Sequence, residues 1–495
     1  MNRRVRAGRL AGRIIRRSAP LALGAALALG PVCGQALPPV APIAARVTAN
    51  GLKADVSFLA SDALEGRGTP SRGLDIAAEF IASEFRRAGL DPAGDDGYFQ
   101  TAEFEQVTAS DQGLTLAAEA NGETVRAQAG SVRLLVAAGG DCDRLPVVRA
   151  TADQPAALES LARGAARGKA LVVEVGEGRR PQMRRVFQLA DRLEPEMVLF
   201  LGKLDSGPGQ AERLRQASDR EPLKPWVSTS DAAFRKAVLA PGARVSAHIP
   251  APKATPVKLR NVIGVLRGGD AGLRDSYVLV TAHYDHLGVA GGDVYNGADD
   301  DASGTASVIE IAEALAGLAE RPRRSVVFAT FFGEELGEWG SRYYVAHPVF
   351  PLAKTAADIN LEQLGRTDEV GVGVQLGQFY LTGFDFTDLP PVFRKAGEPF
   401  GIRVVNDEKH SNQYFPQSDN YPFAEAGVPS TTAAVAFQFS DYHQPGDKWP
   451  KLDYDNMARV VRAIALAVWE VASRPETPAW NPNNPGTESF RTKKR

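Results

Sequence analysis

The sequence predicts an α/β protein with a mainly parallel central sheet flanked by helices, together with a separate, mostly-β region. From Lys258 onwards, short apolar runs alternate with amphipathic segments, and such alternation is typical of a parallel sheet covered by helices on both faces. Between Phe104 and Ile249, β-type runs follow one another with few helical segments. The length of 495 residues, with 44% hydrophobic and 23% charged residues, fits a globular chain of two or three domains.

Local patterns place the individual elements. A helix is expected over 72–88, because its apolar residues recur at helical spacing, a serine precedes it and Gly89 follows it. In the C-terminal part, strands are expected over 260–268, 276–286, 323–335, 356–365 and 428–437, and helices over 304–318, 340–348 and 456–473. Ligands of such sheets bind beyond the carboxyl ends of the strands, so the residues that follow these strands are the first place to look for a site.

The N-terminal residues have the pattern of an export signal. "MNRRVRAGRLAGRIIRR" is rich in arginine and has no acidic residue, and an apolar run ending at Cys33 follows it. The run is shorter than the ~20 residues that span a bilayer, and small residues come next, so we expect a signal peptide over residues 1–36 with cleavage near Ala36. The mature protein is then expected to be periplasmic or secreted. Lipid attachment at Cys33 is the alternative.

Charge and cysteine content exclude some classes. The net charge is −2, and no basic run occurs outside the N-terminus, so nothing in the composition favours binding to nucleic acid. After removal of the signal, Cys142 would be the one remaining cysteine. We therefore expect no internal disulfide, which a chain of this size does not need.

Metal-type side chains follow four of the expected strands. They are His283 and Asp285, Glu334 and Glu335, Glu362, and finally Asp441, His443 and Asp447. Because the carboxyl ends of parallel strands meet at one edge of a sheet, these side chains would crowd one crevice. Clustered carboxylates cannot all ionise without a counter-charge. Imidazoles and carboxylates without a thiolate form the donor set of a catalytic zinc site, and the sequence therefore predicts two Zn²⁺ ions per chain.

Three consecutive aspartates, Asp299 to Asp301, lie between the first two clusters. Two ions about 3.5–4 Å apart need a bridging carboxylate and hold a water between them, and one of these aspartates can supply the bridge. Glu334 and Glu335 are adjacent, so one can bind metal while the other acts as general base. Asp285, two residues after His283, is spaced to accept a hydrogen bond from the imidazole of that residue.

A family resemblance covers nearly the whole mature chain. The segments "TAHYDHLG", "YNGADDDASGTASVIEIA", "FFGEELGEWGSRYY", "INLEQLGR", "SDNYPFAEAGVPS" and "DYHQPGDKW" resemble, in order and spacing, the motifs of the co-catalytic-zinc aminopeptidase family. That family also contains glutamate carboxypeptidase, transferrin receptor and glutaminyl cyclase. "FLASDALEGRGTPSRG" is similar to its N-terminal stretch, and the middle β region resembles the protease-associated domain that some members carry as an insertion.

The resemblance implies a role for particular residues. His283 and His443 would each bind one zinc, Asp300 would bridge the two, Glu335 would be a ligand and Glu334 the general base. Glu362 stands where aminopeptidases of the family usually have Asp, and its extra methylene changes the geometry at that zinc. The resemblance also implies a cis peptide between Asp300 and Asp301.

The remaining candidates have plainer interpretations. His248, His286, His347 and His410 are expected to be solvated or hydrogen-bonded locally. Asp299 and Asp301 are expected to cap loops, and Asp447 to cap a turn.

The resulting domain scheme has five parts. We expect a signal peptide over 1–36, the first part of the peptidase domain over 47–104, the inserted protease-associated-like domain over 105–255, the dizinc peptidase domain over 256–475, and a disordered tail over 476–495.

The predicted function is that of an exported dizinc exopeptidase, in first place an aminopeptidase that acts on peptides. A carboxypeptidase or dipeptidase on the same site is the alternative, and Arg366 is the one candidate to hold a substrate carboxylate. A non-catalytic binding protein of the same fold, or a one-zinc glutaminyl cyclase, fits less well. Neither a nucleic-acid partner nor stable membrane insertion is expected.

Overall fold

The computed structural model describes residues 38–136, 138–151, 162–175, 183–202, 210–216, 224–407 and 410–493. The predicted signal peptide and Cys33 lie outside these residues. The helices are α1 (Val40–Arg46), α2 (Ala49–Leu59), α3 (Arg72–Ala88), α5 (Met183–Leu193), α6 (Ala232–Val238), α7 (Gly304–Ala316), α8 (Trp339–Ala346), α9 (Pro390–Gly397), α10 (Ser411–Tyr414), α11 (Asn420–Glu425), α12 (Tyr454–Ser473) and α13 (Glu488–Arg491). No helix of the described part combines the length and the apolar character that a bilayer crossing requires.

Two large sheets account for most of the strands. The first has the order β21 (Arg403–Val405), β20 (Gln378–Leu381), β22 (Ser430–Ala434), β17 (Thr355–Leu361), β13 (Tyr277–His283), β16 (Ser325–Phe331), β12 (Lys253–Leu266), β2 (Phe99–Ser110) and β9 (Gln210–Gln216), and β1 (Asp91–Pro92) pairs with β12. The second has the order β4 (Glu123–Arg126), β3 (Thr115–Ala120), β11 (Arg244–Ile249), β6 (Gly140–Thr151), β7 (Ala170–Glu174), β8 (Met197–Leu201), β10 (Trp226–Thr229) and β5 (Val132–Leu134). Short hairpins pair β14 (Gly288–Ala290) with β15 (Asp293–Tyr295) and β18 (Asp368–Glu369) with β19 (Gly373–Val374).

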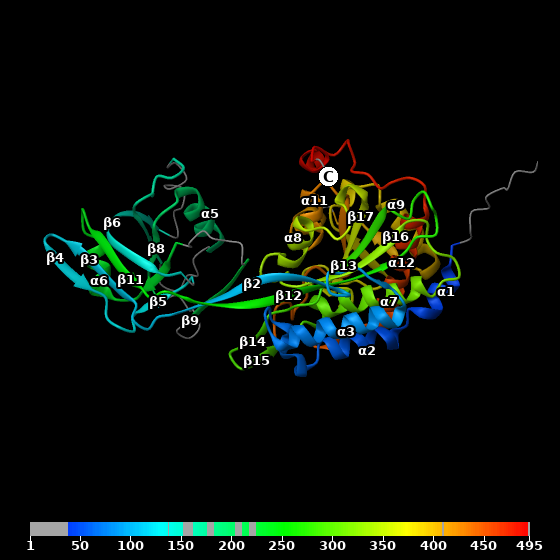
Figure 1. Ribbon diagram of the computed structural model, residues 1–495, viewed down its shortest axis with the longest axis horizontal. Helices are drawn as coiled ribbons and strands as arrows, with labels where there is room; N and C mark the ends of the chain where they lie inside the picture. Colours follow the sequence, from blue (N-terminus) through cyan, green and yellow to red (C-terminus); the bar gives the residue numbers. More distant parts are fainter. Residues whose placement is uncertain are drawn as a thin grey trace, which may run out of the picture. The chain divides into compact units, whose positions relative to one another are not determined.

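The centre of the first sheet is parallel (Figure 1). Strands β16, β13, β17 and β22 are neighbours and run in one direction. Antiparallel strands flank them, since β12 pairs antiparallel with β16, and β20 with β22. The predicted α/β fold is confirmed, and the parallel arrangement holds for the four strands that precede the polar clusters. The antiparallel flanks make the sheet as a whole mixed.

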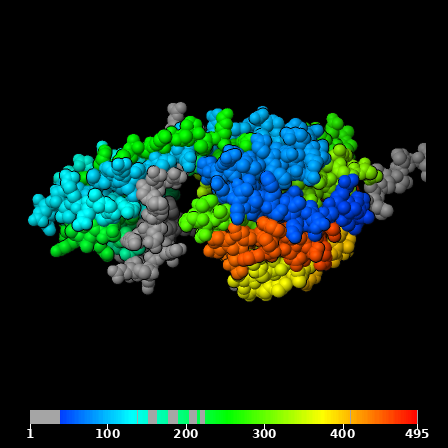
Figure 2. Space-filling view, turned by 90° about the horizontal axis from the view of Figure 1, so that it is seen from below, coloured from blue at the N-terminus to red at the C-terminus, as the bar shows by residue number. Residues whose placement is uncertain are grey.

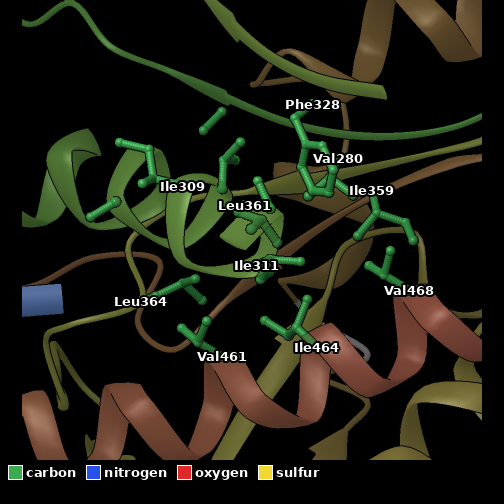
Figure 3. Close-up of a cluster of buried hydrophobic side chains, with 14 of the residues drawn as sticks. Val280, Ile309, Ile311, Phe328, Ile359, Leu361, Leu364, Val461, Ile464 and Val468 are labelled. Carbon is green, nitrogen blue, oxygen red and sulfur yellow. The ribbon is translucent and has the colours of Figure 1, made fainter. Parts of the chain in front are cut away.

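Helices cover both faces of this sheet because each buried strand is apolar on both sides. On β13, Val278 and Val280 belong to the core that includes α7 and α12, whereas Tyr277 and Leu279 belong to the core that includes Tyr344 of α8. Figure 3 shows the first of these cores, where side chains of α7, α12 and three strands meet. Burial on both faces fixes the strands and therefore the positions of the residues at their ends.

The N-terminal helices complete the first core. Ser71 caps α3 by accepting a hydrogen bond from the Leu74 amide, and Gly89 ends the helix in the left-handed conformation, as the sequence predicts. Helix α2 packs against α12, and Figure 2 shows the N-terminal segment in blue beside the C-terminal segment in orange. The N-terminal helices and α12 thus share one core.

The second sheet is formed within Thr115–Ile249, inside the range predicted for the separate domain. The chain leaves the first sheet along β2 and returns along β12, and the two strands pair antiparallel from Phe99–Val262 to Thr108–Lys253. This sheet has its own apolar clusters, one on each face. Strands β6, β7, β8 and β10 are parallel in it, and Cys142 lies on β6 as a free thiol. The identity of this region as a protease-associated domain stays a prediction.

The C-terminal segment differs from the predicted disorder. Residues 476–493 are described and end in α13, and Trp480 and Phe490 are buried with ring centroids 5.0 Å apart. The Trp480 indole donates to the Gly427 carbonyl at 3.0 Å. Both aromatic side chains pack with Phe386, Phe415 and Ala424, although the Pro-rich and Asn-rich composition of the segment suggests a solvated tail.

Candidate metal centre

The parallel strands bring the predicted cluster residues to one edge of the first sheet. His283 is the last residue of β13 and pairs in register with Phe331 of β16, three residues before Glu334. Leu361 is the last residue of β17 and pairs with Ala433 of β22, and Glu362 follows directly. Residues far apart in the chain therefore meet because their strands are neighbours that end together.

One group of metal-type atoms forms around His283. Its Nε2 lies 3.3 Å from Asp300 Oδ1 and 4.0 Å from Glu362 Oε1. One ligand-type atom from each of His283, Asp300 and Glu362 lies within 4.8 Å of the other two. Despite its extra methylene, the Glu362 side chain reaches this group.

A second group forms on the other side of Asp300. The Nε2 of His443 lies 3.0 Å from Asp300 Oδ2 and 3.2 Å from Glu335 Oε2. His286, Asp300 and Glu335 also offer atoms within 4.8 Å of one another. Asp300 thus presents Oδ1 to the first group and Oδ2 to the second, which is the geometry a bridging carboxylate needs.

His286 is the histidine that sequence reasoning missed. The expectation of a solvated or locally bonded ring is wrong, because the side chain is 0% exposed and its Nδ1 lies 2.6 Å from Glu335 Oε1. The position three residues after a predicted ligand, at the end of a buried strand, was the available signal. No local pattern in the sequence shows that the chain turns back there.

Buried hydrogen bonds hold the triple-aspartate loop. Asp299 Oδ1 accepts from the amides of Gly365 and Arg366, at 2.6 and 3.0 Å. Asp301 Oδ1 accepts from the Gly304 amide at 2.9 Å. The predicted loop-capping of these two aspartates is confirmed, and the cis peptide between Asp300 and Asp301 that the resemblance implies is present.

Asp447 has a larger part than the turn cap that the sequence predicts. Its carboxylate is fully buried and accepts from the Asp299 amide at 3.0 Å and from the Asp300 amide at 3.2 Å. It therefore holds the backbone of both Asp299 and Asp300. The link joins the loop after β22 to the triple-aspartate loop.

The two adjacent glutamates point to different groups. Glu335 contacts His286 and His443, whereas Glu334 Oε2 lies 4.0 Å from His283 Nε2. Asp285 Oδ1 accepts from the Glu334 amide at 3.1 Å and so orients this loop. The carboxylate of Asp285 is 3.6 Å from His283 Nδ1, while its backbone carbonyl is nearer, at 3.3 Å. The imidazole thus bonds the carbonyl of Asp285 instead of the expected carboxylate.

The crevice shifts the pKa of its acids in opposite directions. Burial raises the pKa of Glu334 well above its usual range, and the charges of Glu362 and Asp419 add to the effect. Burial also raises the pKa of Glu362 to about 7. Burial acts on Asp300 in the same sense, but the contacts with His283 and His443 hold the pKa of Asp300 far below its usual value. The side chains therefore differ in how readily they take up a proton.

A buried arginine was also missed. Arg67 is 0% exposed, and its guanidinium donates to the carbonyls of Tyr284, Asn296 and Gly297 at 2.7, 2.7 and 2.9 Å, and to that of Leu59. The carbonyls of Tyr284, Asn296 and Gly297 belong to the loops that precede and follow the β14–β15 hairpin, and that of Leu59 belongs to the last residue of α2. Arg67 places a positive charge behind the acids and ties the two loops together. Its signal was the "EGRG" segment of the N-terminal stretch.

Arg366 is engaged with other acids. Its guanidinium donates to both carboxylate oxygens of Asp368, at 2.7 and 2.6 Å, and to Asp441 at 2.8 Å. It also lies over the Phe439 ring, 4.8 Å from the centroid. The group that would recognise a substrate carboxylate is thus already paired.

A cavity of about 100 Å³ lies beside Glu362. The rings of Tyr414 and Phe437 stack along it at 4.6 Å. Further lining residues are Gln363, Thr382, Gln417, Thr432, Ala434, Gln438 and Tyr442. Among the described residues that line it, Glu362 is the one with a charge.

The donor atoms fit metal ions. Buried atoms without a hydrogen-bond partner in the described part include His283 Nε2, both nitrogens of His286, Asp300 Oδ2 and Glu335 Oε1. Leaving polar atoms buried and unpaired costs free energy, and cations among them would remove that cost. Fold and site together define the class, an α/β protein with a metal-binding constellation beyond the carboxyl ends of parallel strands.

Comparisons with known proteins show what the C-terminal part of the chain resembles. Residues 261–468 match the sequence model of Peptidase family M28. Aminopeptidase YwaD of Bacillus subtilis is 26% identical over 227 residues, which cover 44% of this chain and 46% of that protein. Residues 261–468 of the chain are therefore similar to peptidase family M28. The segment spans about half the length of the curated relatives it matches.

Solved structures show the same fold. An aminopeptidase from Aneurinibacillus sp. strain AM-1 superposes with a TM-score of 0.57 at 18% identity, covering 90% of this chain and 98% of that one. A zinc aminopeptidase from Bacillus subtilis superposes with a TM-score of 0.54 at 20% identity, covering 86% and 95%. At such identities the likeness supports the fold.

Proposed function

We propose that this chain is an exported zinc aminopeptidase that holds two metal ions, one at each group. The observation that carries the proposal is the position of Asp300, whose two carboxylate oxygens face two separate groups of imidazole and carboxylate donors. His283, Asp300 and Glu362 would hold one ion, and Asp300, Glu335 and His443 the other. The match of residues 261–468 to peptidase family M28 and the fold shared with the solved aminopeptidases support the assignment. Export rests on the N-terminal sequence pattern.

Two zinc ions held there would lower the pKa of a water molecule and polarise the carbonyl of the scissile peptide bond. Glu334 is the residue placed to move the proton. Its carboxylate lies near His283, in the first group, and is not one of the proposed ligands of the second ion. It would take a proton from the attacking water and deliver it to the departing amine nitrogen.

The cavity beside Glu362 is proposed to receive the side chain of the N-terminal residue. Its volume of about 100 Å³ and its stacked aromatic wall suit an uncharged side chain of moderate size. The described lining offers no cation to pair with an acidic side chain. A lysine or arginine side chain would have Glu362 as its one charged partner, and Glu362 is already committed to the first group.

The structure argues against the carboxypeptidase alternative, because Arg366, its candidate for binding a substrate carboxylate, is already paired with acids. Arg366 is bonded to two carboxylates, so a substrate carboxylate would have to displace Asp368 or Asp441. Peptide partners, rather than nucleic acid, remain the proposed substrates.

The test is a panel of aminoacyl 4-nitroanilides, each with a free and with an acetylated amine, assayed with and without a chelator. We expect cleavage of the free-amine substrates with uncharged side chains, loss of activity with chelator, and recovery on adding Zn²⁺. Acetylated substrates should not be cleaved. Cleavage restricted to acetylated substrates, or activity indifferent to chelator, would overturn the assignment.

A further inference from the structure

We propose that His286 is a fourth protein ligand at the second metal group, so that the two groups are unequal. The second would be closed by four protein ligands, His286, Asp300, Glu335 and His443. The first, with three, would keep an open position. The inference rests on the proposed metal-dependent function, and its test reads metal binding instead of catalysis.

The ring of His286 points into the second group. Nδ1 lies 2.6 Å from Glu335 Oε1 and 3.9 Å from Asp300 Oδ2. Zinc bonds of 2.0–2.2 Å place tetrahedral ligand atoms about 3.3–3.6 Å apart. The distances of His443 Nε2 to Asp300 and Glu335 are 3.0 and 3.2 Å, slightly below this separation. One His286 distance is shorter than the separation and the other is longer.

An ordinary core histidine does not account for this ring. Buried imidazoles normally bond through both nitrogens, because an unpaired buried nitrogen costs free energy. Neither nitrogen of His286 has a hydrogen-bond partner in the described structure, and neither does Glu335 Oε1 despite the short contact. Donor atoms that lie close together without bonding each other are arranged around a shared position.

The backbone is built to hold the ring there. The His286 amide donates to the Arg67 carbonyl at 3.2 Å. A Cβ at Gly297 would lie 2.4 Å from Cγ of the His286 ring and 2.2 Å from the Asp300 carbonyl oxygen. Glycine at 297, with φ of +54°, therefore gives the ring room beside the bridging aspartate.

The unequal ligand counts have a chemical consequence. Zinc sites with four protein ligands are closed and hold the metal tightly, whereas catalytic sites keep an open position for water or substrate. The His283 group would thus be the exchangeable, substrate-facing one, next to Glu334. The His286 group would be the more retentive one.

The experiment measures zinc per chain by mass spectrometry after dialysis of the holoenzyme against graded dipicolinate. We expect the wild type to lose its ions in two steps. His286→Ala should weaken the retentive step about 10–100-fold and merge the two, and His286→Asn should be intermediate because its amide oxygen can replace Nδ1. His347→Asn, at an exposed histidine, is the matched control and should behave as the wild type.

X-ray absorption on the wild-type zinc protein covers the case in which the variants do not fold. We expect three imidazole ligands over the two zinc ions if His283, His286 and His443 all bind metal. If His286 does not bind, the total is two. A total of two imidazole ligands over the two zinc ions would overturn the inference. So would a well-folded His286→Ala variant that loses zinc at the same dipicolinate concentrations as the wild type. A three-imidazole site in a protein that cleaves no aminoacyl substrate would refute the proposed function alone. An active enzyme with two imidazoles would refute this inference alone.

Discussion

At the scale of single residues, adjacent side chains acquire different functions because the backbone directs them apart. Glu335 contacts two imidazoles of the second group, while its neighbour Glu334 faces His283. Their surroundings differ accordingly, since the histidine contacts lower the pKa of Glu335 against the effect of burial, whereas burial raises that of Glu334. One environment suits a carboxylate that binds metal, and the other suits a carboxyl group that exchanges protons.

This contrast predicts the behaviour of Glu334→Gln. The amide keeps the shape but cannot accept the proton, so kcat on an aminoacyl nitroanilide should fall about 10²–10⁴-fold. Zinc content should stay unchanged, because Glu334 belongs to neither group of donor atoms that lie within 4.8 Å of one another. The exposed Glu320→Gln is the isosteric control. A Glu334→Gln variant that retains wild-type turnover would show that another residue is the base.

At the scale of elements, helices α2, α3 and α7 bury a cluster of acids away from the candidate centre. Asp55 of α2 faces Glu310 and Glu313 of α7 and Glu84 and Arg87 of α3. Burial, with the charges of Glu310 and Glu84, raises the pKa of Asp55 to about 8. Arg87 pairs with Glu84 and Glu313, which leaves Asp55 Oδ2 buried without a hydrogen-bond partner.

The cluster predicts a pH-dependent stability. In the unfolded chain Asp55 ionises near 3.8, and in the folded protein near 8, so between these values the folded state binds more protons and stability falls as pH rises. The amide side chain of an Asp55→Asn variant cannot ionise, so this residue no longer lowers the stability of the folded state as the pH rises. The variant's free energy of unfolding should match the wild type near pH 4 and exceed it by on the order of a few kcal/mol at pH 9.

Chemical denaturation across pH 4–9 measures this difference, with the exposed Asp293→Asn as control. Glu310, whose pKa burial raises to about 7, contributes a loss of the same sign in both proteins. An Asp55→Asn stability gain that does not change with pH would contradict the assignment of the effect to ionisation.

At the scale of the whole molecule, the centre joins segments that lie far apart in the chain. His283 ends one strand, residues that come after four other strands complete the centre, namely Asp300, Glu335, Glu362 and His443, and Arg67 comes from the N-terminal part. Metal ions among them would cross-link these segments. A ligand that binds only the folded state stabilises it, by about 4 kcal/mol at a thousandfold excess over the dissociation constant.

Metal removal should therefore lower thermal stability. We expect chelation to lower the Tm by several degrees and re-addition of Zn²⁺ to restore it, as measured by calorimetry with and without chelator. The chelator should leave the Tm of an Asp300→Asn variant nearly unchanged, since that variant lacks the charge shared by both groups. A wild-type Tm that is insensitive to the loss of bound zinc would contradict the cross-linking role.

The sequence by itself determined the elements and the chemical types at their ends. Apolar runs of strand length and helical periodicity are local properties, so β13, β16, β17, β22, α7 and α12 could be predicted from the residues. Histidine and acids after four such strands already indicated metal chemistry at one sheet edge, and the motif series added a resemblance to a family.

The tertiary structure alone decided which side chains complete the centre. His286, Asp447 and Arg67 look ordinary in sequence, and each acquires its place through contacts with segments distant in the chain. Burial of the C-terminal segment by Trp480 and Phe490 was decided in the same way. The physical reason is that periodicity and charge act within a few residues, whereas burial, metal-type clustering and hydrogen bonding to distant loops arise only when strands pair and helices pack.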